Sequence, residues 1–329
     1  MATIQDIEDE VGISKAAVSR ILNHKGSFNP ETIRKVERAA KRLNYKTIHM
    51  LKQENETEGK TIALIFPPSD SPYYGIYTML IEQAAYSYGY DLLLCTSLFK
   101  EKSEEESLWE LKNKNVSGIL LGNFVKDTAL LTKLDIPVVT VGFKADDAIC
   151  SVTPDNDSCG HIAARHLTGR GCRNLLYLTR FPEGLKYDLR YKGFLEEARK
   201  RGANVWPYQV GIEMDMQRDV PGIITEMSMK HPEADGVFSE TFRLAAMFYR
   251  TYTDLGYRVP QDIKIVGYGN AYMASYSSPR LTIVRENTSQ MAEQAVATLV
   301  DRIENGPSEN LDRENEIHIP VSLEVGQTT

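Results

Sequence analysis

Apolar residues recur at three- and four-residue steps in three short stretches near the N-terminus, and this spacing predicts three helices. The first is expected over residues 4–11 and ends at Gly12, since glycine favours a helix C-terminus. The second follows over residues 15–22, and the third opens at Asn29 with the cap-and-proline sequence "NPET". A glycine turn between two short helices is typical of a helix-turn-helix. The pattern therefore predicts a small all-α headpiece.

The second of these helices has one apolar face and one small, basic face. The basic face carries Lys15, Ala16, Ser19 and Arg20, and the hydroxyl of Ser14 is placed to cap the helix. In a helix-turn-helix the second helix enters the major groove of DNA with its N-terminal residues first. The arginine fork matches two acceptors on guanine. We therefore expect Lys15, Ala16 and Arg20 to face base edges and Ser19 a phosphate, with Ser14 also among the DNA-binding residues.

From residue 61 the pattern changes to short apolar strands separated by helical stretches, such as "KTIALIF", "YDLLLCT", "VSGILLG" and "IPVVTVG". The alternation resumes in the second half with "NLLYLT", "ADGVFS" and "DIKIVGYG". Repeated β–α units predict parallel sheets, and two sets of them predict two doubly wound lobes with ligands at the carboxyl ends of the strands. We expect a headpiece at residues 1–46, a hinge or linker at 47–60 and a two-lobed α/β core at 61–329.

Charge separates the headpiece from the rest of the chain. The 329 residues carry a net charge of −7, yet residues 11–46 hold nine Lys and Arg and only two acids, which is +7 and leaves −14 elsewhere. A basic module on an acidic body indicates a nucleic-acid contact confined to one end. The alternative is a solvated helix face on which basic residues cluster by chance.

The sequence disfavours several other classes of protein. No apolar run is long enough for a membrane span, and the start of the chain lacks the basic-then-apolar pattern of a signal peptide. We therefore expect a cytoplasmic protein without membrane contact. The four cysteines lack C-x-x-C spacing and are interpreted as reduced packing residues rather than as a metal site or disulfide framework: Cys95, Cys150, Cys159 and Cys172.

An enzyme is the main rival class. His161 and His166 lie near Asp157 and Cys159, but the two histidines are five residues apart and share a helix face poorly. H-E-x-x-H, G-x-S-x-G and phosphate-loop motifs are absent from the sequence. We expect no catalytic residue, no metal and no cofactor.

The N-terminal segment "MATIQDIEDEVGISKAAVSRILNHKG", followed by "ETIRKVERAAKRLNY", resembles the DNA-binding headpiece of the lactose/galactose repressor (LacI/GalR) family. The resemblance implies a homodimer that reads a pseudo-palindromic operator in double-stranded DNA. It also implies DNA contacts for Thr3 and Ile4 at the start of the first helix and for Asn23 after the recognition helix. Since no heptad pattern follows "VSLEVGQTT", we expect dimers rather than tetramers.

The remainder of the chain resembles the periplasmic-binding-protein-like core of the same family, through "DNDSCGHIAARHL", "LRYKGF", "VPQDIKIVGYGN" and "SPRLTIVREN". The resemblance places a small-molecule cleft between the lobes. Ser71, Tyr73 and Tyr74 in "SPYY" match the family's polar-proline-aromatic-aromatic motif, and aromatic faces stack well on sugars. Arg190 is the cation expected to grip two ligand oxygens. The alternatives are ordinary packing for the tyrosines and a structural ion pair for Arg190.

Departures from the family pattern leave the effector open. Gly269 replaces the usual aspartate, with Asn270 beside it, and Glu286 replaces a common glutamine. The pair Ser239–Glu240 stands at the place of an asparagine-aspartate pair. Among these residues, Ser239, Asn270 and Glu286 are expected to contact the effector. The favoured effector is a neutral sugar or glycoside, and the motif "PYY" favours a galactoside. Binding of the effector is expected to weaken the affinity for the operator.

Two other functions remain open for this chain. A catabolite-control-type regulator would answer to a partner protein or a phosphosugar, but a phosphate would favour a cluster of Arg and Lys that the matched positions lack beyond Arg190. A sugar-binding transport protein would need export, for which the sequence carries no signal.

The linker departs from the family too. There the segment after the headpiece forms a hinge helix, and a leucine wedges into the minor groove. Here Glu54 occupies the expected leucine position, so Met50 or Leu51 is the candidate wedge, one turn earlier. The alternative is a plain acidic linker that never inserts.

Overall fold

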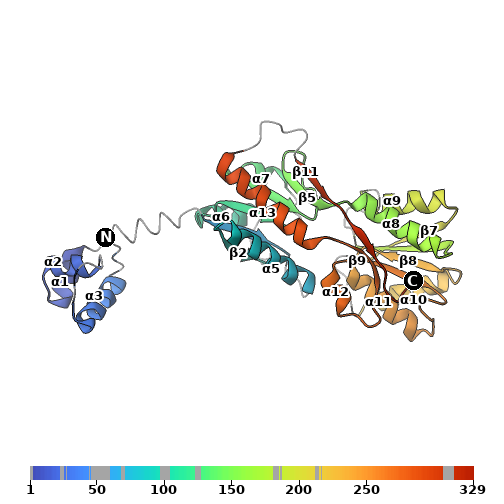
Figure 1. The fold of residues 1–329 in the computed structure, drawn as a ribbon, viewed down its shortest axis with the longest axis horizontal. Coiled ribbons are helices and arrows are strands. Elements are labelled where there is room, and N and C mark those ends of the chain that lie inside the picture. Colours follow the sequence, from blue (N-terminus) through green and yellow to red (C-terminus); the bar gives the residue numbers. More distant parts are fainter. Residues whose placement is uncertain are drawn as a thin grey trace. The chain divides into compact units, whose positions relative to one another are not determined.

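In the computed structural model the chain forms two compact units, residues 1–61 and 62–329 (Figure 1). It describes residues 3–22, 26, 28–43, 45, 60–67, 71–96, 104–122, 127–180, 185, 187–211, 215, 217–306 and 315–329.

The first unit contains the three predicted helices, α1 (Ile4–Val11), α2 (Lys15–Leu22) and α3 (Pro30–Arg42). Thr3 begins α1 with a capping box, in which the Asp6 carboxylate accepts from the Thr3 backbone N–H at 2.6 Å. Gly12 ends α1 in the left-handed region at φ 74°, which glycine adopts without steric cost. The helices bury a small apolar core: Ile7, Val18, Ile21, Leu22, Val36, Ala39 and Ala40. The predicted all-α headpiece is confirmed.

The first lobe of the core is a six-stranded sheet in the order β11-β5-β4-β3-β1-β2, with helices on both faces. Its strands are β1 (Thr61–Ile65), β2 (Asp91–Cys95), β3 (Gly118–Leu121), β4 (Val138–Val141), β5 (Cys150–Pro154) and β11 (Glu316–Ile319). Its helices are α5 (Pro72–Ser87), α6 (Glu104–Asn113), α7 (Ala129–Thr132) and α13 (Thr288–Asn305). Helix α13 packs beside α5 on this sheet, although it follows most of the second lobe in sequence (Figure 1).

The second lobe is a six-stranded sheet in the order β12-β10-β9-β8-β6-β7. Its strands are β6 (Asn174–Thr179), β7 (Asn204–Gln209), β8 (Gly236–Ser239), β9 (Lys264–Gly269), β10 (Thr282–Arg285) and β12 (Ser322–Glu324). Its helices are α8 (Asn156–Gly169), α9 (Leu189–Lys200), α10 (Val220–Lys230), α11 (Phe242–Asp254) and α12 (Ala271–Ser275). Pairing is parallel except for β12, which runs antiparallel to β10. The predicted pair of doubly wound lobes is confirmed.

The chain passes between the lobes three times, after β5, after β10 and after β11. Each passage leaves a parallel strand at its carboxyl end, so loops of both lobes gather around these crossings. Glu286 lies on the second crossing, directly after β10. The topology therefore brings residues from distant parts of the sequence to one place.

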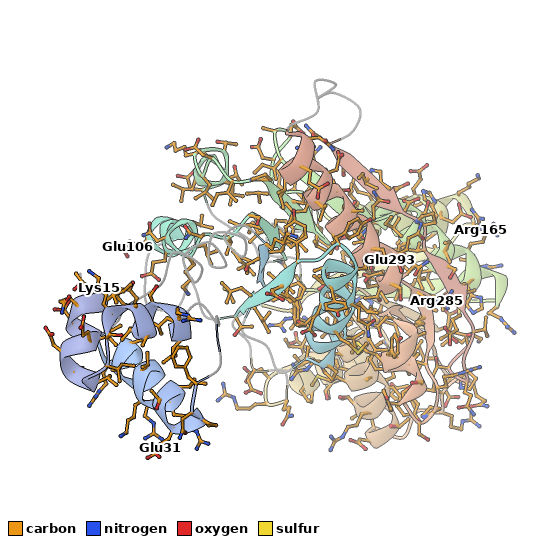
Figure 2. The ribbon with its side chains drawn as sticks, turned by 60° about the vertical axis from the view of Figure 1, so that its left-hand side comes forward. Lys15, Glu31, Glu106, Arg165, Arg285 and Glu293 are labelled. Carbon is orange, nitrogen blue, oxygen red and sulfur yellow. The ribbon has the colours of Figure 1, made fainter. Side chains whose placement is uncertain are left out.

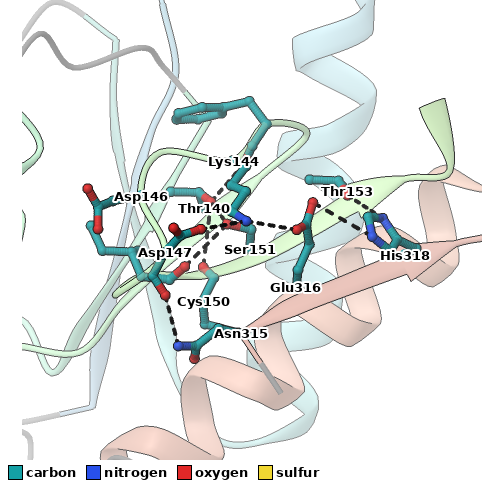
Figure 3. Close-up of polar contacts among 12 residues, drawn as sticks. Thr140, Lys144, Asp146, Asp147, Cys150, Ser151, Thr153, Asn315, Glu316 and His318 are labelled. Atoms are coloured by element: carbon teal, nitrogen blue, oxygen red, sulfur yellow. Dashed lines mark hydrogen bonds and ion pairs between the residues drawn. The ribbon is translucent and has the colours of Figure 1, made fainter. Parts of the chain in front are cut away.

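A polar network holds the returning strand β11 to the first lobe (Figure 3). Lys144 Nζ lies 2.7 Å from Asp147 Oδ1 and 3.0 Å from Glu316 Oε2, and these two carboxylates raise the pKa of the lysine. His318 Nδ1 lies 3.0 Å from Thr153 Oγ1 on β5. These contacts fix the third crossing on the first-lobe side.

In the described part of the chain, no helix is long and apolar enough to cross a membrane. The four cysteines are buried free thiols. Burial raises the pKa of Cys159 to about 12, so this thiol stays protonated near neutral pH.

Candidate functional site

Helix α2 presents its basic face as predicted from the sequence. Lys15, Ala16 and Arg20 are exposed, whereas Val18 on the opposite face is buried (Figure 2 labels Lys15). Ser14 Oγ accepts from the Ala17 backbone N–H at 3.4 Å and so begins the helix. An exposed, basic and short helix of this kind is suited to a DNA groove.

The other predicted DNA contacts lie partly outside the described residues. Thr3 is exposed, and Ile4 packs against the headpiece core. Ser19 on α2 is half-buried. Asn23, Met50 and Leu51 lie outside the described residues.

In the core, Glu286 is the centre of a carboxylate–tyrosine cluster that joins the two lobes. Its side chain accepts from Tyr77 at 2.8 Å and from Tyr73 at 3.1 and 3.3 Å, both on first-lobe helix α5. It also accepts from Tyr268, at the end of second-lobe strand β9. Burial, followed by the charge of Glu286, raises the pKa of all three phenols well above the usual range. The tyrosines are therefore hydrogen-bond donors throughout the neutral pH range.

Arg190 lies next to this cluster on the second lobe. Its Nε donates to Asn156 Oδ1 at 2.7 Å, and its Nη1 donates to the Glu240 carbonyl at 2.8 Å. Its guanidinium carbon lies 3.5 Å from the centre of the Tyr268 ring, a cation–π contact. Burial opposes the charge, but neighbouring titratable groups, Tyr268 first and Glu240 among them, raise the pKa of Arg190.

Two more buried carboxylates lie on the second-lobe side. Thr179 Oγ1 and the Arg180 backbone N–H each donate to Glu240 at 2.5 Å. Burial raises the pKa of Glu240, although these hydrogen bonds and Arg190 oppose that effect. Asp188 caps α9 and accepts from Tyr177 at 2.7 Å. Glu240 is therefore the carboxyl group of this pair that acts on Arg190, while Asp188 acts on Glu240.

The remaining predicted effector residues take positions that hold local structure. Ser71 is the N-cap of α5, with Oγ accepting from the Tyr73 backbone N–H at 3.4 Å. The Tyr74 ring packs 5.1 Å from the Phe66 ring. Ser239 ends β8 and donates to the Thr241 carbonyl at 3.2 Å.

Asn270 combines a structural role with an open donor. Its Oδ1 caps α12 by accepting from the Met273 backbone N–H at 3.0 Å. Its Nδ2 is buried and has no hydrogen-bond partner among the described residues. A buried amide N–H of this kind favours an acceptor supplied from outside the protein.

Sequence reasoning missed Tyr77, Tyr268, Asn156 and Asp188. Tyr77 follows Tyr73 by four residues, so the helical spacing places both on one face of α5 and was a usable signal. The other three are identified only by their contacts with Arg190 and its neighbours.

The histidines considered for catalysis make surface and packing contacts instead. His161 lies 3.4 Å from Asp157 and 3.5 Å from Glu197. His166 Nε2 lies 2.8 Å from Thr329 Oγ1, and burial lowers the pKa of this imidazole. Over the described ranges, no group of three His, Cys, Asp or Glu residues is arranged to hold a metal ion.

Residues 3–47 match the lacI family of bacterial regulatory proteins, and residues 164–329 match a periplasmic binding protein-like domain. The HTH-type transcriptional repressor PurR of Proteus mirabilis (strain HI4320) is 31% identical over 93% of this chain and 91% of its own. The chain belongs to the LacI family. This LacI-family protein is a DNA-binding transcriptional repressor and not an enzyme, which confirms what the sequence resemblance implied.

Two further proteins are similar to this LacI-family chain over most of its length. The ribose operon repressor of Halalkalibacterium halodurans is 28% identical over 100% of this chain and 97% of its own. A periplasmic binding protein/LacI transcriptional regulator from Alkaliphilus metalliredigens QYMF was crystallised in complex with D-xylulofuranose. That structure is 27% identical, has a TM-score of 0.72 and covers 82% of this chain and 99% of that one.

Proposed function

We propose that this LacI-family repressor is a cytoplasmic homodimer that binds an operator through α2 and releases it when a neutral sugar or glycoside binds between the core lobes. The observation that carries the effector class is the Glu286 cluster beside Arg190. It offers a carboxylate acceptor, phenol donors and aromatic faces at one crossing, which together suit a ring bearing several hydroxyls.

The DNA-binding part of the proposal rests on the headpiece at residues 1–46. Lys15, Ala16 and Arg20 face base edges, and Ser19 a phosphate. Thr3 begins α1 and Ser14 begins α2, and both residues contact the DNA. Ile4, which follows Thr3, contacts it too. The exposure of the basic face of α2 supports this arrangement. Contacts by Asn23, and a minor-groove wedge of Met50 or Leu51 in the linker at 47–60, stay predictions from the sequence.

In the core at residues 61–329, the effector contacts are Tyr73, Tyr74, Arg190, Asn270 and Glu286, with Ser71 and Ser239 supporting the loops that carry them. The names of two relatives favour a sugar, because one is a ribose operon repressor and another was crystallised with D-xylulofuranose. The buried carboxyl groups of Glu286 and Glu240 in the proposed site disfavour a phosphosugar, since like charges repel in a buried site. Galactosidic preference rests on "PYY" alone.

The proposal of a homodimer rests on an apolar groove of about 510 Å³ in the core. Its walls include Pro72 and Ile76 from α5, Phe242 and Tyr249 from α11, and Tyr276 after α12. Tyr276 is 86% exposed, and large exposed apolar surface of this kind marks an association site. A second copy of this chain is the occupant we propose, because a two-fold operator requires two identical headpieces.

A combined screen tests the proposal. Neutral sugars, their phosphates and purines are added to the full chain, and the thermal midpoint and operator affinity are measured together. A neutral sugar is expected to raise the midpoint, because it binds only the folded state, and to weaken operator binding. Stabilisation by purines or phosphosugars alone would reject the sugar class.

Arg190→Ala supplies the site-specific arm of that screen. The variant is expected to lose both responses to the sugar while keeping its operator affinity, since Arg190 lies in the core. Arg199→Ala, which removes an exposed arginine from the same helix, is the matched control and is expected to respond like the parent. An Arg190→Ala variant that still responds would remove this residue from the site.

A further inference from the structure

We infer that Tyr73 is an internal competitor of the effector for Glu286, and that Glu286 selects hydroxyl-bearing ligands over phosphorylated ones. A ligand hydroxyl replaces the Tyr73 hydroxyl as a donor to Glu286. This inference rests on the proposed function, because it takes the Glu286 cluster to be part of the effector site.

The hydrogen bonds to Glu286 differ in a way that singles out Tyr73. Tyr77 donates to one carboxylate oxygen at 2.8 Å, and its side chain is 2% exposed. Tyr73 divides its bond between both oxygens at 3.1 and 3.3 Å, and it is only partly buried. Longer, divided hydrogen bonds are weaker than short, single ones. The Tyr73 hydroxyl is therefore the donor that an incoming group replaces most easily.

The chemistry of the Glu286 carboxylate decides which groups can replace the Tyr73 hydroxyl. An ionised carboxylate is an acceptor only, so the entering group must carry an O–H or N–H. A sugar hydroxyl meets this requirement and takes the place of a phenol hydroxyl with no change in charge. A phosphate brings negative charge to a buried carboxylate, and this arrangement is unfavourable at low dielectric.

Asn270 supplies the complementary half of a hydroxyl site. The Glu286 backbone N–H donates to the Gly269 carbonyl at 2.8 Å. Asn270 is the next residue after Gly269, so its backbone lies beside that of Glu286. Its buried Nδ2 has no partner among the residues that the structure describes. A hydroxyl both donates and accepts, so it satisfies a carboxylate and an amide N–H in one site.

The positive charge of Arg190 does not remove this preference for hydroxyl-bearing over phosphorylated ligands. Its guanidinium already donates to Asn156 and to the Glu240 carbonyl and lies over Tyr268. The buried carboxyl group of Glu240 is near enough to raise the pKa of Arg190, and the buried Asp188 acts in turn on Glu240. Two of the guanidinium donors of Arg190 are therefore engaged by protein acceptors before any ligand enters.

Calorimetry on the full chain tests the competition directly. The probes are D-ribose, D-galactose and cellobiose, together with D-ribose 5-phosphate and D-galactose 6-phosphate. Tyr73→Phe keeps the ring and removes only the competing hydroxyl. We expect it to bind the neutral sugars that the parent binds about three- to tenfold more tightly, the size of one net hydrogen bond. Glu286→Gln is expected to bind them about tenfold or more weakly and to lose most discrimination against the phosphates.

Two controls separate competition from a general effect of losing a phenol. Tyr86→Phe removes the same atom from an 80% exposed position of α5 and is expected to leave affinity unchanged. Tyr77→Phe removes a buried donor that holds Glu286 and is expected to give no tightening. Circular dichroism confirms that each variant is folded.

The outcomes distinguish the inference from the proposed function. If the parent binds a neutral sugar and Tyr73→Phe binds it equally or more weakly, the competition is overturned while the sugar function stands. Unchanged discrimination in Glu286→Gln overturns the role of Glu286 in selection. A parent that binds none of the neutral sugars rejects the proposed function, and the inference with it.

Discussion

Gly160 of α8 lies directly against the backbone of Arg190 on α9. A Cβ at this glycine would lie 2.1 Å from the Arg190 carbonyl oxygen and 2.4 Å from the Phe194 nitrogen. Gly193 of α9 makes the reciprocal approach, since a Cβ there would lie 2.3 Å from the Asp157 carbonyl oxygen. Two glycines thus allow the helices to touch backbone to backbone. This contact fixes the first turn of α9, from which Arg190 reaches the Glu286 cluster.

Gly160→Ala is expected to destabilise the core by about 1–3 kcal/mol, because the clashing atoms are backbone and cannot move aside as a side chain does. The same substitution displaces Arg190 and weakens sugar binding. Urea unfolding measures the first effect and calorimetry the second. Gly169→Ala, in the same helix with no atom within 4 Å of the added Cβ, is the control and is expected to be neutral or slightly stabilising. Equal stability of the two variants would refute the close-contact argument.

The sequence predicted the headpiece well because its signals are local. Helical periodicity, the turn at Gly12 and the cap and proline at Asn29 and Pro30 all act within a few residues, and each is found in the structure. The β–α alternation likewise predicted both lobes. The antiparallel strand β12 was not predicted, since it belongs to a short return after the third crossing rather than to a β–α unit.

The candidate site was predictable only in part. Tyr73, Arg190 and Glu286 were each proposed from matched motifs, but their meeting depends on three crossings that no local spacing encodes. Ser71 and Asn270 show a second difficulty. A polar residue after a strand suits both a helix cap and a ligand contact, and the structure gives both residues capping bonds.

Arg20→Ala in the recognition helix is expected to weaken operator binding by about 1–3 kcal/mol and to relax preference at one base pair in each half-site. The reason is that an arginine fork reads guanine through two hydrogen bonds. Gel shifts with systematically changed operators measure both effects. Arg34→Ala removes an exposed arginine from α3 and is expected to leave base preference unchanged. Retained preference in Arg20→Ala would mean that α2 does not read the bases as proposed.

Glu197 is expected to make the core sensitive to acid. Its carboxylate accepts from Arg201 at 2.6 Å and from Arg165 at 3.3 Å. The Arg201 hydrogen bond first, and that of Arg165 after it, lower the pKa of Glu197 to about 2 against the opposing effect of burial. Because this pKa lies below the ordinary value of 4.5, the stability it contributes is present above pH 4.5 and is lost as pH falls toward 2.

Glu197→Gln is therefore expected to lose about 1 kcal/mol at neutral pH, a modest figure because both arginines reach water, and to unfold with a weaker pH dependence below pH 4.5. Urea unfolding across the acid range provides the measurement. Glu196→Gln changes the exposed neighbouring carboxyl on the same helix and is the control. If both variants lost stability with falling pH as the parent does, Glu197 would not be the source of the acid sensitivity.

Tyr276→Asp is expected to dissociate the dimer. Tyr276 lines the apolar groove with Phe242 and is 86% exposed in the single chain, so a partner must cover it if the groove is the interface. Burying an unpaired carboxylate there costs about 2 kcal/mol or more, which shifts light scattering toward the monomer and weakens operator binding, since two linked headpieces bind more tightly than one. Met229→Asp places the same charge at a 75% exposed position on α10, outside the groove, and is expected to stay dimeric. A Tyr276→Asp variant as dimeric as Met229→Asp would place the interface elsewhere.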